Sequence, residues 1–279
     1  MSEVAYHEGS WSAPDSQRRF SYRLWRPPTV KALLVLVHGF GEHSGRYQAM
    51  AEAFVEQGLC VAVPDLWTHG HSGGARGDLA NVHRCVDDLR QLTENVFLPE
   101  TTQSHYALFG HSFGGLVAIH WAMANPPELR RVTVQSPLLE VGFSIPRWKR
   151  KAVLFLAGVW PTCSLSMGLD VGALSHDPAI ARAYQADPLV HNAMSVRTYL
   201  SILQAQHDAL ALAGTIRVPV LLLYGTADRI ISVASAQRWF DQLQCEKRCI
   251  SFPGYYHELR HEAVRDEVME LVCQWTLAE

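Results

Sequence analysis

The chain lacks the features that would export it from the cell or insert it into a membrane. Its first ten residues are polar and have no basic segment followed by an apolar one, so we expect no signal peptide. No uninterrupted apolar run is long enough to span a bilayer. The six cysteines are scattered and form no C-x-x-C pair, which indicates reduced thiols rather than a disulfide framework. We therefore expect a cytoplasmic protein.

Charge is also scarce, and neither sign dominates. Charged residues make up 18% of the 279 positions, and the formal net charge is -3. Nucleic-acid-binding proteins normally carry a concentrated basic surface, so this balance argues against one. Hydrophobic residues, by contrast, make up 48% of the chain, which excludes a disordered protein and supplies a large core.

Predicted strands and helices alternate along most of the chain. Ala32–Val37 is an unbroken aliphatic run, which is typical of a strand buried on both faces. Residues 47–57 then have helical spacing and stop at Gly58. Such alternation implies crossover connections and an α/β fold with a mostly parallel sheet. Further strands are predicted at 3–10, 18–25, 59–63, 106–109, 132–135, 218–224 and 248–252, and further helices at 78–97, 114–124, 233–243 and 262–277.

The alternation stops between about residues 137 and 217. This segment has no clean strand pattern, only short helical pieces interrupted by prolines. We therefore predict a core of residues 1–136 and 218–279, with an all-helical cap of residues 137–217 inserted after the sixth strand. Such a cap would lie over the carboxyl edge of the sheet, where open α/β sheets place their ligands.

A candidate nucleophile lies at the end of one predicted strand. Residues 110–114 read GHSFG and match the G-x-S-x-G pattern, in which the serine occupies a strained strand-to-helix turn. Glycines on both sides let the strand and the helix approach without a Cβ clash. Because a predicted strand precedes the motif and a predicted helix follows it, we interpret Ser112 as a catalytic nucleophile rather than a helix cap.

Two backbone N–H groups are candidates for an oxyanion hole, which would stabilise the negative charge formed when Ser112 attacks an ester. The first is that of Phe113, directly after the nucleophile. The second is that of Phe40, in the glycine-rich HGFG segment that follows Ala32–Val37.

An acid and a histidine follow the last two predicted strands, in the order Ser, Asp, His that is typical of this arrangement. Asp228 lies in the loop after 218–224, and His257 lies just beyond 248–252. Asp228 would orient His257 and stabilise its imidazolium form. Asp208 and Asp241 are alternative acids, but both fall in predicted helices.

Residues 257–261 read HELRH and literally match the H-E-x-x-H zinc signature. That chemistry needs both histidines on one face of a regular helix. Pro253 and Gly254 lie directly upstream, so we predict His257 on a loop and expect no metal site.

With these residues assembled, the chain resembles the monoacylglycerol lipase and lysophospholipase group of α/β-hydrolases, which is sometimes filed with serine aminopeptidases. The resemblance spans roughly residue 32 to the C-terminus. It rests on HGFGEHSGRY at 38–47, GHSFGG at 110–115, Gly225 with Asp228, Tyr256 with His257, and Tyr184 with DPL at 187–189. One departure is Thr68, at a loop position where the family tends to have glycine.

The resemblance implies a serine carboxylester hydrolase that cleaves monoacylglycerols, uses neither metal nor cofactor, and binds the glycerol hydroxyls through the polar end of its pocket. The residues it places at that end are Glu42, Arg46, His111 and Tyr184. A lysophospholipase, a small-ester hydrolase or an aminopeptidase on the same scaffold stays open. The aminopeptidase would need an acidic or carbonyl-rich pocket in the cap, to which Asp170 and Asp177 could contribute. A hydrolase-fold scaffold without activity is a further alternative, but such proteins often lack a part of the site that is present here.

The cap contains a strongly apolar run at residues 153–160. Such a run could be buried within the protein, line an acyl tunnel, or bring the cap to a membrane surface. These possibilities can overlap, and the sequence does not choose among them.

Overall fold

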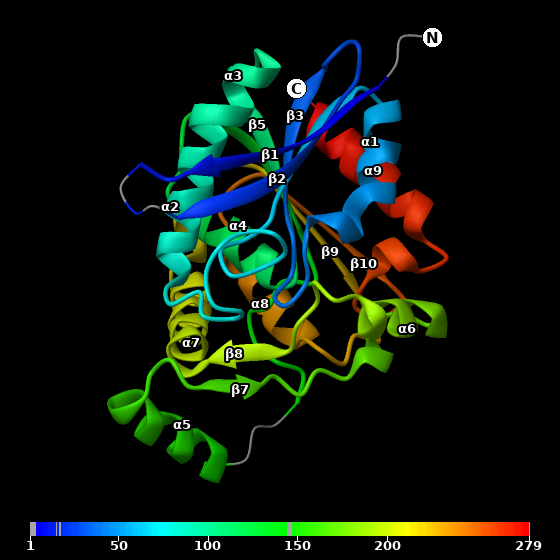
Figure 1. Cartoon of the computed structure of the whole chain (residues 1–279). Coiled ribbons are helices and arrows are strands. Elements are labelled where there is room, and N and C mark those ends of the chain that lie inside the picture. The colour runs from blue at the N-terminus through cyan, green and yellow to red at the C-terminus, as the bar shows by residue number, and fades with distance from the viewer. Residues whose placement is uncertain (1–3, 15, 17, 144–146, 279) are drawn as a thin grey trace.

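The computed structural model describes residues 4–14, 16, 18–143 and 147–278, with the side chains of 147–150 outside the description. In this part of the chain, eight strands form one sheet with the order β1-β2-β4-β3-β5-β6-β9-β10 (Figure 1). The β1–β2 and β2–β4 pairs are antiparallel, and the other neighbours are parallel. The strands are β1 (Ala5–Ser12), β2 (Arg19–Arg26), β3 (Ala32–Val37), β4 (Leu59–Pro64), β5 (Tyr106–His111), β6 (Leu129–Gln135), β9 (Val220–Gly225) and β10 (Lys247–Phe252).

The central strands are buried on both faces, as their aliphatic runs predict. Every residue of β4, β5 and β9 is buried, because helices cover both sides of the sheet. One face packs against α1 (Gln48–Glu56) and α9 (Arg265–Leu277). The other face packs against α2 (Val82–Leu92), α4 (Phe113–Met123) and α8 (Val233–Gln242). The predicted α/β class with a mostly parallel sheet is thus confirmed.

The helix predicted at 78–97 is shorter and less regular than expected. It begins after Asn81, whose side chain accepts a hydrogen bond from the Arg84 N–H. Ala80 just before it has a φ of 68°, which a helix does not allow. After α2 the chain continues as a π-helical turn (Thr93–Phe97) and a short α3 (Leu98–Thr101).

The insertion between β6 and β9 contains α5 (Arg147–Val159), α6 (Pro178–Ala186) and α7 (Val196–Ala211). It is not all helical, and that part of the prediction was wrong. Two three-residue strands, β7 (Ser164–Ser166) and β8 (Ala193–Ser195), pair in antiparallel fashion within it. Strands this short show no alternation that a sequence pattern could reveal. The cap limits at 137 and 217 stay predictions.

One part of the insertion is bonded firmly to the core. The Asp78 carboxylate accepts hydrogen bonds from the Ser195 hydroxyl (2.8 Å) and from the Arg197 Nε (2.6 Å). The His43 Nε2 lies 2.8 Å from a carboxylate oxygen of Asp187. These contacts join the segments around Asp187 and Ser195 to the core.

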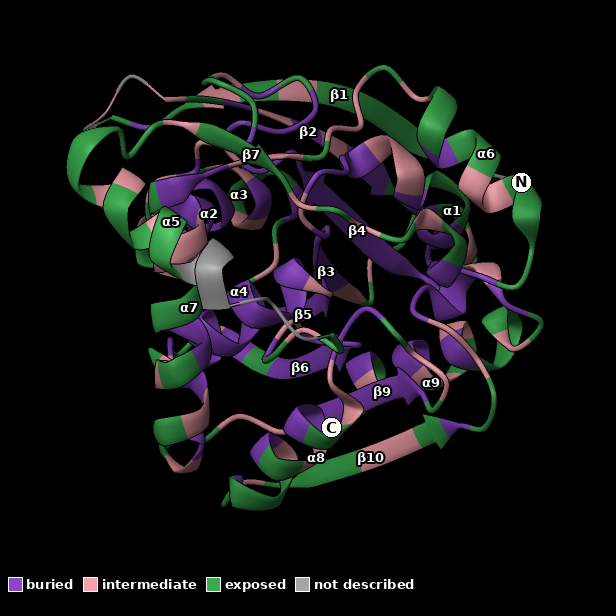
Figure 2. Cartoon of the chain, turned by 90° about the horizontal axis from the view of Figure 1, so that it is seen from below, coloured by how far each residue is buried: buried purple, intermediate pink, exposed green. Residues whose placement is uncertain are grey.

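The described part of the helix α5, residues 151–159, is in contrast mostly exposed (Figure 2). Four large apolar residues within this helix or directly after it are 60–70% exposed: Leu154, Phe155, Val159 and Trp160. None of the helices in the described residues has the length and apolar character required to cross a bilayer.

Candidate active site

Ser112 occupies the turn between β5 and α4, at the carboxyl edge of the sheet. Its φ of 53° places a non-glycine residue in the left-handed region, which costs energy unless the surroundings enforce it. The flanking glycines are required for this turn. A Cβ at Gly114 would lie 2.1 Å from the Val37 carbonyl oxygen, and one at Gly110 would lie 2.3 Å from the Gly114 carbonyl oxygen. The turn therefore holds its serine against β3 in a strained, defined position.

Asp228 and His257 meet beyond β9 and β10. The His257 Nδ1 lies 2.6 Å from Asp228 Oδ2, and both side chains are almost fully buried. The other Asp228 oxygen accepts the N–H groups of Ile230 (2.8 Å) and Ile231 (3.1 Å). These backbone donors fix the carboxylate, so it can hold the Nδ1–H of His257 and leave Nε2 free to accept a proton.

The loop that carries His257 is also anchored through its backbone. The His257 carbonyl accepts hydrogen bonds from Gln135 Nε2 (2.9 Å) and the Ser136 hydroxyl (3.1 Å). Asp208 and Asp241, the alternative acids, lie on α7 and α8 and bond to glutamines of their own helices. The three predicted triad residues thus come to the same sheet edge, while the alternatives do not.

Phe40 and Phe113 lie next to each other at this edge. Their rings contact edge to face, with the centroids 5.4 Å apart. Phe113 is the first residue of α4, so its N–H has no acceptor within the helix. The loop of Phe40 is held by Gly39, whose N–H donates to Glu42 (2.6 Å), and by Gly41, whose carbonyl accepts the His191 N–H (2.8 Å). Both predicted donors therefore sit in rigid surroundings.

A cavity of about 640 Å³ runs from Ser112 and His257 into the cap. Its volume falls within the range of small-molecule sites, and most of its wall is apolar. The apolar wall comes from the core and from α5 and α7, and includes Leu138, Val153, Leu156, Leu174, Ile202 and Ile230.

The end of the cavity near the sheet is polar, and three of the predicted substrate-binding residues lie there: Glu42, His111 and Tyr184. Arg46 is not among the described residues that line the cavity. Its guanidinium instead lies 4.6 Å from the centre of the Tyr184 ring and donates to Glu42 and Glu258. The substrate-binding role of these residues stays a prediction.

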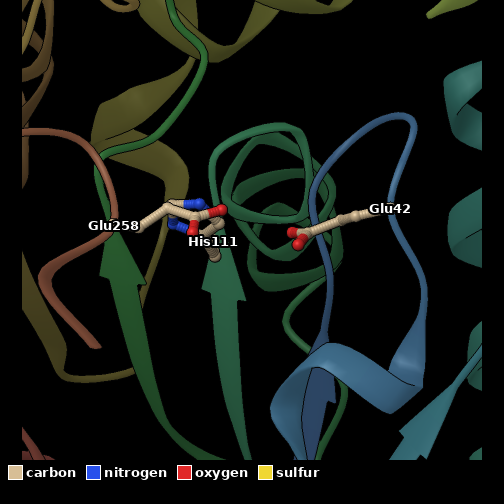
Figure 3. A group of neighbouring side chains, drawn as sticks. All are labelled: Glu42, His111 and Glu258. Carbon is tan, nitrogen blue, oxygen red and sulfur yellow. The ribbon is translucent and has the colours of Figure 1, made fainter. Parts of the chain in front are cut away.

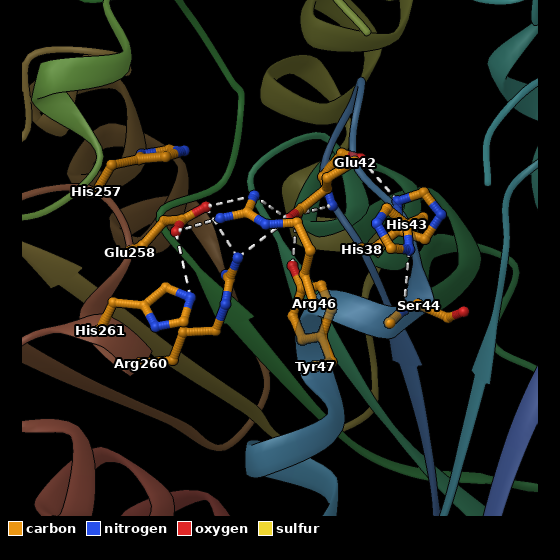
Figure 4. A network of polar contacts seen from close by, with 12 residues as sticks. His38, Glu42, His43, Ser44, Arg46, Tyr47, His257, Glu258, Arg260 and His261 are labelled. Carbon is orange, nitrogen blue, oxygen red and sulfur yellow. Dashed lines mark hydrogen bonds and ion pairs between the residues drawn. The ribbon is translucent and has the colours of Figure 1, made fainter. Parts of the chain in front are cut away.

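Two charged residues that the sequence reasoning did not assign complete this polar end. Glu258 and Arg260, from the HELRH segment, join Glu42 and Arg46 in a buried ion-pair network (Figure 4). Burial by itself disfavours the charged form of Glu42. The adjacent guanidiniums of Arg260 and Arg46 outweigh it and hold the pKa of that carboxyl well below its usual range. The clue in the sequence was the charge pattern directly after His257, which the zinc interpretation obscured.

His111 stands between the nucleophile and this network. Its ring centroid is 4.8 Å from that of His257. Burial, assisted by the nearby Arg260 charge, lowers the pKa of His111 well below its usual range, so the ring is neutral at pH 7.

Potential metal-ligating atoms of Glu42, His111 and Glu258 lie within 4.8 Å of one another (Figure 3). Both carboxylates, however, already bind Arg46 and Arg260, so a divalent cation would have to enter beside two guanidiniums. The two histidines of HELRH do not share a site either. His257 pairs with Asp228, whereas His261 lies 3.5 Å from Glu258. This donor set suits an internal salt-bridge network better than a metal.

Thr68, the departure from the family pattern, adopts a left-handed conformation. Thr68 is buried and has a φ of 71°, which a β-branched residue adopts only under strain. Its N–H donates to the Gly73 carbonyl (2.8 Å), and its hydroxyl contacts His69. Holding Thr68 in this left-handed conformation costs about 1–3 kcal/mol.

Comparisons with known proteins show the family of this chain. Residues 28–263 match the model of the family described as serine aminopeptidase, S33. The chain is 30% identical over 266 residues to a monoacylglycerol lipase of Mycolicibacterium smegmatis, covering 93% of each chain. It also spans 27% of a longer uncharacterized abhydrolase domain-containing protein of Dictyostelium discoideum, at 29% identity over 91% of this chain.

One solved structure is similar to this chain over almost its whole length. The crystal structure of Paleococcus ferrophilus monoacylglycerol lipase superposes with a TM-score of 0.83 at 30% identity, covering 99% of both chains. Because the match covers almost the whole of both chains, it includes the insertion as well as the sheet. The chain therefore belongs to the serine aminopeptidase S33 family of serine hydrolases, within the α/β-hydrolase fold.

Proposed function

We propose that this enzyme hydrolyses monoacylglycerols to a free fatty acid and glycerol through a Ser112–His257–Asp228 triad. The observation that carries the proposal is the cavity, a largely apolar space with one polar end placed at Ser112 and His257. An acyl chain would occupy the apolar part under α5 and α7, and the glycerol would face the polar end near Glu42 and Tyr184.

The reaction proceeds in two steps through an acyl-enzyme. His257 Nε2 takes the proton of Ser112 as its oxygen attacks the ester carbonyl, and the N–H groups of Phe40 and Phe113 stabilise the oxyanion. His257 then gives the proton to the departing glycerol oxygen. A water molecule, deprotonated by the same histidine, attacks the acyl-enzyme and releases the fatty acid. Asp228 stays ionised and holds the imidazole in the required tautomer.

The charges near the site disfavour an aminopeptidase. A carboxylate that binds a peptidase substrate's α-ammonium should be free of other cations, whereas Glu42 and Glu258 are both neutralised by arginines. The two acids considered for this role do not line the cavity. Asp170 lies 3.8 Å from Arg229, and Asp177 caps α6 through the Ala179 N–H. A lysophospholipid stays an alternative, because its phosphate would meet the same neutralised carboxylates.

We also propose that the cap brings the enzyme to lipid surfaces through α5. Val153 and Leu156 on this helix line the cavity, while Leu154 and Phe155 project to solvent. An exposed apolar patch of this kind beside the cavity wall suits a helix that lies in a membrane interface and receives substrate there.

The decisive experiment compares initial rates on a monoacylglycerol, the lysophospholipid and diacylglycerol of the same chain, and an aminoacyl-arylamide. We expect the monoacylglycerol to be the best substrate. Ser112→Ala should lower kcat by about 10⁴-fold or more without a change in melting temperature. A higher kcat/KM for the arylamide or the lysophospholipid would reject the proposed substrate class and leave the triad in place.

A further inference from the structure

The proposed mechanism needs a fixed relation between two loops that no single strand pair joins. The loop after β3 carries the Phe40 N–H, and the loop after β10 carries His257. In the sheet order, β5, β6 and β9 lie between these two strands. No direct strand pairing therefore joins the oxyanion donor to the base, and a contact between the two loops would restrain their distance beyond what the intervening strands do.

Four buried side chains make that contact, and we call them the loop-bridging cluster: Glu42, Arg46, Glu258 and Arg260 (Figure 4). Arg46 donates to Glu42 (2.8 Å) and to Glu258 (3.0 Å). Arg260 donates to Glu42 (3.0 Å) and to Glu258 (2.8 Å). Each guanidinium thus joins both carboxylates, and the cluster closes into a ring with two positive and two negative charges.

Each carboxylate is linked directly to one of the two loops that the proposed mechanism uses. Glu42 accepts the N–H of Gly39, the residue before Phe40, at 2.6 Å, and also the Tyr47 hydroxyl at 2.6 Å. Glu258 follows His257 in the chain, and its own N–H donates to the cap residue Leu174 (2.8 Å). The cluster therefore connects the oxyanion loop, the histidine loop and the cap.

Stability alone does not account for such an arrangement. The four side chains are only 2–10% exposed, so all four charges have lost most of their hydration. Replacing a balanced buried ion pair by apolar groups of similar size is often neutral or stabilising. What the ring supplies is geometry, because Arg46 contacts both oxygens of Glu258 with two nitrogens, while Arg260 contacts Glu42 and Glu258 with one nitrogen, Nη2.

We propose that the loop-bridging cluster positions the Phe40 N–H relative to His257, with Arg260 and Glu258 acting as positioning residues for catalysis. This inference rests on the proposed triad and oxyanion hole, but not on the identity of the substrate. Since a displacement of about 1 Å at a reacting centre can cost ~100-fold in rate, loss of the cluster should appear mainly in kcat.

The test is the double variant Glu258→Gln with Arg260→Met, which removes one charge of each sign and leaves the Glu42–Arg46 pair balanced. The control is Arg18→Met with Asp88→Asn, which removes another ion pair (2.7 Å) with a buried carboxylate, one whose residues do not line the cavity. Both are compared with the wild type for melting temperature, kcat and KM on p-nitrophenyl butyrate, and the rate of labelling by a fluorophosphonate. The aryl ester has no glycerol, so a residue that only binds glycerol would not affect its hydrolysis.

We expect the cluster variant to stay folded and to lose about 100-fold in both kcat and labelling rate, with KM nearly unchanged. Arg260→Lys, which keeps the charge and one nitrogen that can contact both carboxylates, should restore part of kcat relative to Arg260→Met. Wild-type kcat in the double variant, or an equal loss of kcat in the control, would overturn the inference. A wild type that cleaves the aryl ester but no monoacylglycerol would reject the proposed substrate and leave this test intact.

Discussion

Replacing Asp228 by asparagine tests the triad at the atom where it is most constrained. One Asp228 oxygen accepts two backbone N–H groups, from Ile230 and Ile231, and the other accepts the His257 Nδ1–H. In the Asp228→Asn variant the amide oxygen must face the two N–H donors, because an NH₂ group there would oppose them. The NH₂ group is then turned toward His257 and forces Nδ1 to become an acceptor. The proton moves to Nε2, which can no longer take the proton of Ser112.

A wrong tautomer of this kind lowers kcat by about 10⁴-fold, or roughly 5.4 kcal/mol of transition-state stabilisation. The free energy of unfolding should change by no more than about 1 kcal/mol, because every hydrogen bond of the side chain has a replacement. Steady-state hydrolysis of p-nitrophenyl butyrate measures the first quantity and urea denaturation the second. Asp241→Asn, on the exposed part of α8, is the matched control and should retain wild-type kcat. A loss smaller than about tenfold for Asp228→Asn would refute the assignment of Asp228 as the orienting acid.

Three further results are expected. Gly114→Ala should lower the free energy of unfolding by about 1–3 kcal/mol or more in urea titrations, because its Cβ would lie 2.1 Å from the Val37 carbonyl oxygen. Gly158→Ala is the control: its Cβ would have no atom within 4 Å, so it should stabilise α5 by up to about 1 kcal/mol. Burial lowers the pKa of His69 and His111 well below 6.5, so the folded protein keeps both neutral while the unfolded chain protonates them. The free energy of unfolding is therefore highest above pH ~6.5 and decreases as the pH falls, by up to about 1.4 kcal/mol per pH unit for each histidine. A free energy of unfolding that is constant from about pH 7.5 to 5.5 would contradict this prediction. Phe155→Glu should reduce co-sedimentation with phospholipid vesicles at unchanged kcat on a soluble ester, whereas Leu212→Glu, at another exposed apolar site, should not.

Local patterns were sufficient to predict most of the core. The aliphatic run Ala32–Val37 is buried on both faces, as predicted, because a central parallel strand tolerates nothing polar on either side. GHSFG predicts its own turn, because the glycines at 110 and 114 fill positions where a Cβ has no room. The chain order of Ser112, Asp228 and His257 needs only the strand boundaries to place all three at one sheet edge. The roles of these residues in catalysis stay predictions.

Sequence patterns could not predict the structure where an element is too short to show a period, or where a residue adopts a conformation that its type disfavours. The β7–β8 ribbon has three residues in each strand, too few for any period to show. Thr68 takes a left-handed conformation that threonine disfavours on its own, so only its surroundings explain it.

The sequence by itself therefore determined the strands of the sheet and the nucleophile turn, because each of these depends on neighbours within a few residues or on a spacing of about 2.0 or 3.6. The resemblance to the family came from longer motifs such as HGFGEHSGRY at 38–47. The tertiary structure alone decided how the polar end of the cavity is neutralised. Arg46 and Glu258 lie 212 positions apart, and Arg260 and Glu42 lie 218 apart. No periodicity relates residues at such separations, and the HELRH segment taken alone resembles a zinc motif. Only when the fold closes do these charges meet in a buried space, where each must find an opposite charge because water is no longer available to solvate it.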